Sequence, residues 1–352
     1  MFRKVLCLTL LVLGLLACEL QAGLVNSKWV GGERGEWGNK NNWDPSVVPD
    51  NNPFNAFAVT IDSNSIGVNG IEVYLEQDRT IDTLHCSGII ELHGPDGVTM
   101  KLTYPNGITN HGSLEVSGLT IAGNVTNLNA ATLLLQDEVN IEDANLYNCS
   151  GAVLEGGVEL EQGNIENAGV IVLKPGHDMW VDYKFRNTGQ IRLIDGEPGS
   201  GGTFHNDGII SGFGKFCDDG QVIHNTGKIV ASGGSLYIYD ALITNTGILT
   251  NHVGATLHFE MPVTDVNNQG TVEINADGSI VFDCNLVNSS DPNAIISLRG
   301  GTLSAQSITQ TEGARFEGFG GIVGDVIMGL VQKRLIWGNS SERVSTIAEH
   351  RE

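Results

Sequence analysis

The stretch that decides the fold is a motif repeated in the middle of the chain. It reads Asn187-Thr-Gly-Gln-Ile-Arg-Leu, then Asn206-Asp-Gly-Ile-Ile, Asn225-Thr-Gly-Lys-Ile and Asn245-Thr-Gly-Ile-Leu. In each copy, Gly stands two residues after Asn and an apolar residue stands four residues after it. The copies begin 19, 19 and 20 residues apart. Self-similarity at a fixed period is typical of a protein built by stacking one structural unit.

Copies of this motif extend along most of the chain. Weaker matches at Asn129-Ala-Ala and Asn148-Cys-Ser fill the gap between the copies at Asn110 and Asn167, and successive Asn are 19 to 23 residues apart. Nine residues form the recurring Asn position: Asn110, Asn129, Asn148, Asn167, Asn187, Asn206, Asn225, Asn245 and Asn268.

Three neighbouring positions of the motif also have a constant character. Two residues before the Asn, eight of the nine copies are apolar, and the exception is Asn127. Two residues after the Asn stand seven Gly, one Ala and one Ser, which are expected where the backbone turns sharply. All nine copies are apolar four residues after the Asn. This alternation with a period of two predicts strands with one buried face.

These features predict an all-β protein, a right-handed parallel β-helix with about 19–20 residues per coil. The repeat is too short for a propeller blade, it lacks the Leu spacing of leucine-rich repeats, and it has no strict hexapeptide period. Equivalent residues of such a solenoid stack about 4.8 Å apart on successive coils. The recurring Asn side chains are therefore expected to form a ladder of amide hydrogen bonds.

The two ends of the chain differ from the repeats. Residues 1–22 have a charged start, an apolar stretch and a small-residue cleavage site, as in a signal peptide. Leu15-Leu-Ala-Cys18 resembles a bacterial lipobox, so lipid attachment at Cys18 is the alternative to simple secretion. We expect a signal peptide at 1–22, a Trp-rich N-terminal cap at 23–61, a parallel β-helix at 62–328 and a polar C-terminal tail at 329–352.

The composition limits both the fold class and the kinds of partner that the protein can have. The 352 residues include 46 Gly and 31 Asn, and the formal net charge is −22. Gly and Asn suit turns rather than helical bundles. The negative charge argues against nucleic acid as a partner. After residue 22 no run is apolar enough to span a bilayer, so no transmembrane span is expected.

The expected mature chain contains four Cys, at Cys86, Cys149, Cys217 and Cys284. Consecutive Cys are 63 to 68 residues apart, which is more than three coils. That spacing separates them by about 14 Å or more along the axis, whereas a disulfide needs Cα atoms less than about 7 Å apart. We expect four separate, mostly buried thiols.

Three of the five Trp lie close together near the N-terminus, at Trp29, Trp37 and Trp43. Large rings suit the closing of an open solenoid end, and such a cluster could equally stack on sugar rings. With Gly31, Gly32 and an Asn before the third Trp, the segment resembles the W-x-G-G…W…N-W start of exported bacterial β-helical repeat proteins, among them autotransporter-passenger-like and planctomycete-type surface proteins. The resemblance implies this architecture and a surface or extracellular location, but no reaction.

Ionisable side chains concentrate in the coils between residues 167 and 225. Arg186, His205 and His224 each stand directly before a ladder Asn, and Asp218 and Asp219 lie in the loop between the two His. Many parallel β-helices are polysaccharide lyases or hydrolases, which need a base and cations beside a uronate, or two carboxylates. These five residues are the candidate catalytic residues, although turns of acidic proteins often carry adjacent carboxylates.

Cofactors and metals are not indicated by any motif. A metal site at His205 and His224 is conceivable because the rings are one coil apart, but two ligands are weak evidence. No calcium-loop motif is found, so the acidic surface is expected to bind Ca²⁺ weakly at most. We predict no cofactor and no dedicated metal site.

The sequence favours a non-catalytic structural or adhesive protein that is secreted or held at the cell surface. The coils are nearly uniform in length, whereas an enzyme's cleft on this fold is usually walled by long loops. The largest spacing, 23 residues before Asn268, lies away from the ionisable cluster. Extracellular polysaccharide or cell-surface components are the expected partners. A polysaccharide-active lyase or hydrolase is the alternative.

Overall fold

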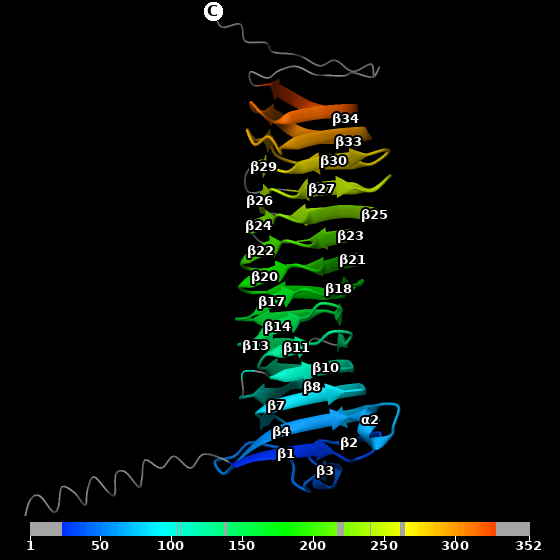
Figure 1. The fold of residues 1–352 in the computed structure, drawn as a ribbon, viewed down its shortest axis with the longest axis vertical. Coiled ribbons are helices and arrows are strands. Elements are labelled where there is room, and N and C mark those ends of the chain that lie inside the picture. Colours follow the sequence, from blue (N-terminus) through cyan, green and yellow to red (C-terminus); the bar gives the residue numbers. More distant parts are fainter. Residues whose placement is uncertain are drawn as a thin grey trace, which may run out of the picture.

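The computed structural model describes residues 23–328, except 104, 106, 137–138, 217–221, 240 and 261–264. This part of the chain forms a parallel β-solenoid of about 12 turns with 2% helix, and its coils stack into one elongated rod (Figure 1). The predicted all-β parallel β-helix with an Asn ladder is confirmed.

The two predicted end segments lie outside the described residues. These are the signal peptide at 1–22, with Cys18, and the polar tail at 329–352. Across the described part of the chain, no helix has the length and apolar character needed to cross a membrane.

Each coil has three sides, and equivalent sides stack into three parallel faces. The ladder face carries the recurring Asn, the second face follows the Asn-x-Gly turn, and the third face completes the coil. The ladder face contains β1 (Gly23–Trp29), β4 (Asn55–Asp62), β7 (Thr83–Ser87), β9 (Ile108–Asn110), β11 (Val125–Asn127), β14 (Asn145–Asn148), β17 (Asn164–Asn167), β20 (Lys184–Asn187), β22 (Thr203–Asn206), β24 (Val222–Asn225), β26 (Leu242–Asn245), β29 (Val266–Asn268) and β32 (Leu286–Asn288).

The other two faces share several long strands that bend around a corner. The second face has β2 (Arg34–Glu36), β5 (Ile71–Tyr74), β12 (Thr132–Gln136), β15 (Val153–Gly156), β18 (Val170–Leu173), β27 (Ile248–Asn251) and β30 (Thr271–Asn275). The third face has β6 (Arg79–Ile81), β13 (Asn140–Glu142), β16 (Val158–Glu161), β19 (Asp178–Val181), β28 (Thr256–Glu260) and β31 (Ser279–Phe282). Both faces include parts of β8 (Ile89–Leu102), β10 (Ser113–Ala122), β21 (Gln190–Pro198), β23 (Ile209–Phe216), β25 (Lys228–Tyr239), β33 (Ile295–Gln310) and β34 (Arg315–Met328), and the last two strands also reach the ladder face.

The core consists of side chains that alternate inward along each strand. In β20, Phe185 and Asn187 are buried, whereas Lys184 and Arg186 are exposed. The ring of Phe185 lies against that of Phe204 on the next coil, with centroids 4.5 Å apart. Burial of each such side chain contributes about 1.5–3 kcal/mol, so stacking the same pattern on every coil builds one continuous core.

The buried ladder runs without a break from Asn110 to Gln310. Each Nδ2 donates to the side-chain oxygen of the next member at 2.6–2.9 Å. Several members also donate to backbone near the turn, as Asn167 does to the carbonyl of Gln190 at 3.2 Å. The members are Asn110, Asn127, Asn148, Asn167, Asn187, Asn206, Asn225, Asn245, Asn268, Asn288 and Gln310.

One predicted member of the ladder is wrong. Asn129 is exposed, and Asn127 takes its place between Asn110 and Asn148. The turn after Asn127 is two residues longer than the usual one, so the next strand reaches the apolar column only at Leu133. Asn127 lies 17 residues after Asn110 and 21 residues before Asn148. Asn129, which is 19 residues from both, lies in the longer turn and not in the ladder.

The Gly of the Asn-x-Gly turn is required by stacking. The backbone at Gly208 and Gly227 is not in the left-handed region, so the expected sharp turn is not the reason for Gly. A Cβ on Gly227 would lie 2.1 Å from the carbonyl oxygen of Gly208, and one on Gly208 would lie 2.1 Å from that of Gly189. Successive coils therefore approach too closely at this corner to admit a side chain.

The N-terminal end is closed by the Trp cluster. The rings of Trp37 and Trp29 each meet that of Trp43 edge-on, with centroids 4.7 and 5.1 Å apart. All three rings are buried, and each indole N–H donates to a backbone carbonyl. Buried rings support the capping role and are not available to stack on external sugars. The short strand β3 (Trp43–Asp44) runs antiparallel to β1, beside the 3₁₀ helix η1 (Lys40–Asn42).

The predicted cap region also contains the first coil. Strand β1 pairs in parallel with β4, from Gly23 opposite Asn55 to Lys28 opposite Thr60. Parallel stacking therefore begins at the start of the described chain. The short helix α2 (Ser63–Ile66) follows β4 and leads into the second face.

The cysteines are free, as expected, where the structure describes them. Cys86 and Cys284 are buried and Cys149 is half-buried. Cys217 lies outside the described residues.

Candidate functional site

A line of polar and aromatic side chains runs along the outside of the ladder face. The residue directly before each ladder Asn points away from the core, and strands β14, β17, β20, β22 and β24 hold five of these residues side by side in register. All five are half-buried or exposed. We call them the outer row: Tyr147, Glu166, Arg186, His205 and His224.

The two His of the outer row are stacked. Their ring centroids lie 5.0 Å apart with an interplanar angle of 28°. Partial burial, followed by the charges of His224 and Lys184, holds the pKa of His205 below its ordinary value of 6.5. His205 is therefore a neutral imidazole at neutral pH, with one nitrogen to donate and one to accept a hydrogen bond.

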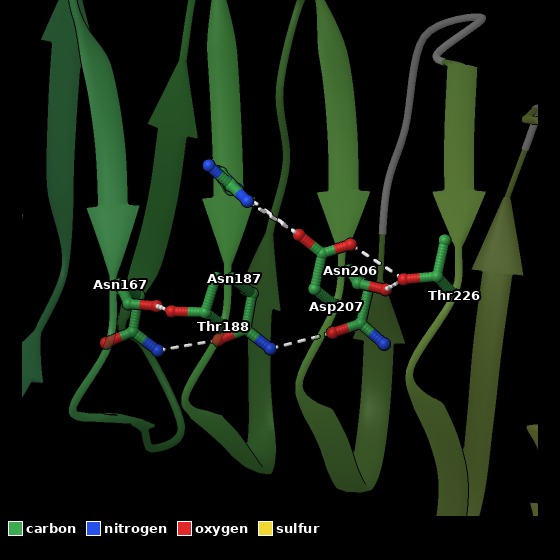
Figure 2. Close-up of polar contacts among 7 residues, drawn as sticks. Asn167, Asn187, Thr188, Asn206, Asp207 and Thr226 are labelled. Carbon is green, nitrogen blue, oxygen red and sulfur yellow. Dashed lines mark hydrogen bonds and ion pairs between the residues drawn. The ribbon is translucent and has the colours of Figure 1, made fainter. Parts of the chain in front are cut away.

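Arg186 is held by a carboxylate from the next coil. Nε and Nη2 of its guanidinium each lie 3.2 Å from Oδ2 of Asp207, and the hydroxyl of Thr226 donates to the other carboxylate oxygen at 2.6 Å. Figure 2 shows this chain of contacts beside the amide ladder. The Thr226 hydrogen bond, with the Arg186 contacts, holds the pKa of Asp207 below its usual range. Asp207 is thus ionised, and both of its carboxylate oxygens already accept hydrogen bonds.

The turn next to the outer row is bonded to the ladder from outside. The hydroxyl of Thr188 donates to the backbone carbonyl of Asn167 at 3.1 Å (Figure 2). The hydroxyl of Thr246 makes the same contact with the carbonyl of Asn225 at 3.4 Å. These bonds fix the corner on which the outer row sits.

The structure brings together three of the five candidate catalytic residues. Arg186, His205 and His224 are neighbours in the outer row, whereas Asp218 and Asp219 lie outside the described residues. Asp207, the carboxylate that binds Arg186, already accepts hydrogen bonds from both Arg186 and Thr226. The arrangement can donate and accept hydrogen bonds and bind carboxylates through Arg186.

One end of the outer row borders an open depression. It is lined by Tyr147, Glu166, Arg186 and Thr188 and by the turns between them. An aromatic ring, a carboxylate and a guanidinium therefore face the same hollow. Such a set suits a ligand with both apolar ring faces and hydroxyl or carboxylate groups.

Sequence reasoning missed a second, outer Asn column on the same face. Asn164 donates to Asn145 at 2.7 Å, and the backbone N–H of Asn145 donates to the side chain of Asn124 at 2.9 Å. Each stands three residues before a ladder Asn, which is the signal that could have found them. Lys184 continues this column on the next coil.

A cluster of two carboxylates and one imidazole near the N-terminal end of the rod was also missed from the sequence. Glu72, Glu91 and His93 come together on the second face, from β5 and β8. The signal was a pair of matching stretches, Ile71-Glu-Val-Tyr and Ile90-Glu-Leu-His, which are 19 residues apart.

Comparison with protein families, with curated proteins and with solved structures finds no match to this chain.

Proposed function

We propose that the protein is a non-catalytic structural or adhesive β-solenoid that acts outside the cell, with the outer row as its contact surface for an extended ligand such as a polysaccharide. The observation that carries the proposal is the register of the outer row. Five side chains able to stack or hydrogen-bond stand in one line along the axis, each fixed by strand pairing to the next. A polymer lying along the rod meets one such group at every coil.

The chemistry of the outer row fits a sugar polymer. Tyr147 offers a ring face for stacking, and Arg186 can bind carboxylates of an acidic sugar. His205, neutral at neutral pH, can donate to one hydroxyl and accept from another. Because the scaffold is already formed, binding along it orders few protein side chains.

The location outside the cell rests on sequence features. The signal-peptide pattern of residues 1–22 supports export, with lipid attachment at Cys18 as the alternative means of retention. The resemblance of the Trp-rich start to exported bacterial repeat proteins points the same way.

The experiment is a panel of uronate-containing and neutral polysaccharides, assayed for binding and for chain cleavage. We expect binding without cleavage, weakened about tenfold or more by Tyr147→Ala or His224→Ala. Tyr237→Ala, on the third face, is the matched control and should bind normally.

Two results would contradict the proposal. Cleavage of a polysaccharide that is abolished by His224→Ala would make the protein a lyase or hydrolase. Equal binding by the Tyr147 and Tyr237 variants would place the contact surface elsewhere.

A further inference from the structure

A cluster on the second face lies beside the Trp-closed end of the rod. Strands β5 and β8 pair Glu72 with Glu91 and Tyr74 with His93. Nε2 of His93 lies 3.5 Å from Oε2 of Glu91 and 4.0 Å from Oε1 of Glu72. The three ligand atoms all lie within 4.8 Å of one another, and no other group of His, Cys, Asp or Glu among the described residues meets this condition.

The imidazole nitrogen at the centre of this cluster has no hydrogen-bond partner within the described part of the chain. Nε2 of His93 is shielded from solvent, although the side chain as a whole is 24% exposed. A shielded nitrogen that faces two carboxylates needs either a proton or a cation to compensate it. A single bridging cation would satisfy the nitrogen and both carboxylates at once.

The donor set favours a transition-metal ion over calcium. Zn²⁺ binds His nitrogen and carboxylate oxygen at about 2.0–2.2 Å in tetrahedral sites, which puts ligand atoms about 3.3–3.5 Å apart. The separations of 3.5 and 4.0 Å approach this value, so small side-chain rotations would close the site. Ca²⁺ instead takes 6–8 oxygen ligands, and an imidazole nitrogen suits Zn²⁺ and similar ions.

Neighbouring side chains already orient the ligands. Nε of Arg34 donates to Oε2 of Glu72 at 2.6 Å, and the hydroxyl of Tyr74 donates to Oε1 of the same carboxylate. The ring of Tyr74 stacks on that of His93 with centroids 5.5 Å apart. A carboxylate oxygen has two lone pairs, so Oε1 can accept from Tyr74 and still bind a cation. Supporting contacts of this kind are typical of metal ligands.

We propose that Glu72, Glu91 and His93 bind a divalent transition-metal ion, with Zn²⁺ as the best match, and that the ion joins two successive coils at the N-terminal end of the rod. An open depression lined by Tyr74, His93 and Gly94 adjoins the cluster, so water can complete the coordination. The site is independent of the outer row and of any polysaccharide.

The test is a Zn²⁺ titration of the full chain after removal of metal by a chelator, read by calorimetry and by melting temperature. His93→Ala removes the nitrogen ligand, and Glu91→Gln removes one charge while keeping the shape of the side chain. His258→Ala is the matched control, because His258 is 22% exposed and faces one carboxylate, Asp283 at 3.1 Å.

We expect Zn²⁺ to bind the native chain and raise its melting temperature, with affinity at least about tenfold lower in His93→Ala and in Glu91→Gln. The His258→Ala variant should bind as the native chain does. Circular dichroism verifies that each variant is folded. Absence of binding to the native chain, or binding unchanged by His93→Ala and Glu91→Gln, would overturn the proposal; the second result would place the ion elsewhere, for example at the stacked His205 and His224.

Discussion

The ladder face carries two columns of side chains with opposite properties. One is the inner column, which holds the buried Asn ladder, and the other is the outer row, whose residues directly precede ladder residues in the sequence. From Asn110 to Gln310 the inner column is nearly uniform: its side chains are at most 1% exposed, and each bonds to the next. The outer row instead contains Tyr, Glu and Arg on three successive coils, followed by His on the next two. Because strand pairing and the inner column set the geometry of the coil, the outer column can vary without disturbing it. Repetition inside provides stability, and variation outside provides a surface that can distinguish ligands.

The inner column itself changes character near the N-terminus. On the two coils before Asn110, the same position is occupied by Ile61 and Cys86. There the turn is supported by helix α2, where the hydroxyl of Ser63 accepts from the backbone N–H of Ile89 at 3.0 Å. An amide is thus needed where no other group supplies the turn with hydrogen bonds.

The largest predicted contrast between inside and outside is in thiol reactivity. Burial in the inner column raises the pKa of Cys86 from 9.0 to about 12, which lowers its thiolate fraction on the order of 10³-fold. Cys149, one residue outside the ladder, is half-buried. In the native protein we expect an alkylating reagent to modify Cys149 and spare Cys86, as measured by peptide mass mapping. Modification of both at similar rates would contradict the inner placement of Cys86.

The next contrast concerns the corner between the ladder and second faces. Gly227→Ala should destabilise the protein by about 3 kcal/mol, because the new Cβ would overlap a backbone carbonyl. Gly201→Ala, where the nearest atom to the Cβ is 3.4 Å away, should cost less than about 0.5 kcal/mol. Denaturant unfolding of both variants measures the difference, and similar midpoints would show that the coils are not closely stacked at Gly227.

The ladder itself should respond less than the corner but more than the surface. Asn225→Ala should cost about 1–3 kcal/mol, because it leaves the amide of Asn206, the side-chain oxygen of Asn245 and the carbonyl of Ile248 without their partners. Lys228→Ala, on the outside, should cost less than about 0.5 kcal/mol. Equal melting temperatures for these two variants would refute a stabilising ladder.

The smallest expected effect is a pH dependence from the outer row. The pKa of His205 is lowered from 6.5, so the unfolded chain binds the proton more readily than the folded chain. Its contribution to stability is complete above 6.5, falls as the pH drops through 6.5, and levels off below the folded pKa. Solvent screening at this half-buried site on the surface keeps the effect small. His205→Gln should therefore lose slightly less melting temperature than the native chain between about pH 7.5 and pH 5; an identical loss would exclude this coupling.

The repeat and the ladder could be predicted because stacked coils convert spatial repetition into sequence repetition. The register between Asn110 and Asn148 could not, since two residues added to a turn leave the motif looking regular around Asn129. The polar Asn127 in an otherwise apolar column was the mark of the shift. A pattern search finds the column but not the strand pairing that selects its member.

The candidate sites divide in the same way. The neighbourhood of Arg186, His205 and His224 followed from equal positions in successive coils. Its partner Asp207 did not, because the contact depends on how two side chains bend across a corner. The cluster at Glu72, with Glu91 and His93, lies before the Asn motif begins, where no column had been aligned.

The division between a stabilising inner column and a ligand-binding outer row is tested most directly at two neighbouring residues of one strand. The variants Arg186→Ala and Asn187→Ala are compared for thermal stability and for polysaccharide binding. Asn187→Ala should lose about 1–3 kcal/mol of stability and, while folded, bind like the native chain. Arg186→Ala should lose at most about 1 kcal/mol and bind about tenfold or more weakly. If Arg186→Ala binds normally, or if the polysaccharide is cleaved by the native chain and not by Arg186→Ala, the assignment of the outer row as a non-catalytic contact surface is contradicted.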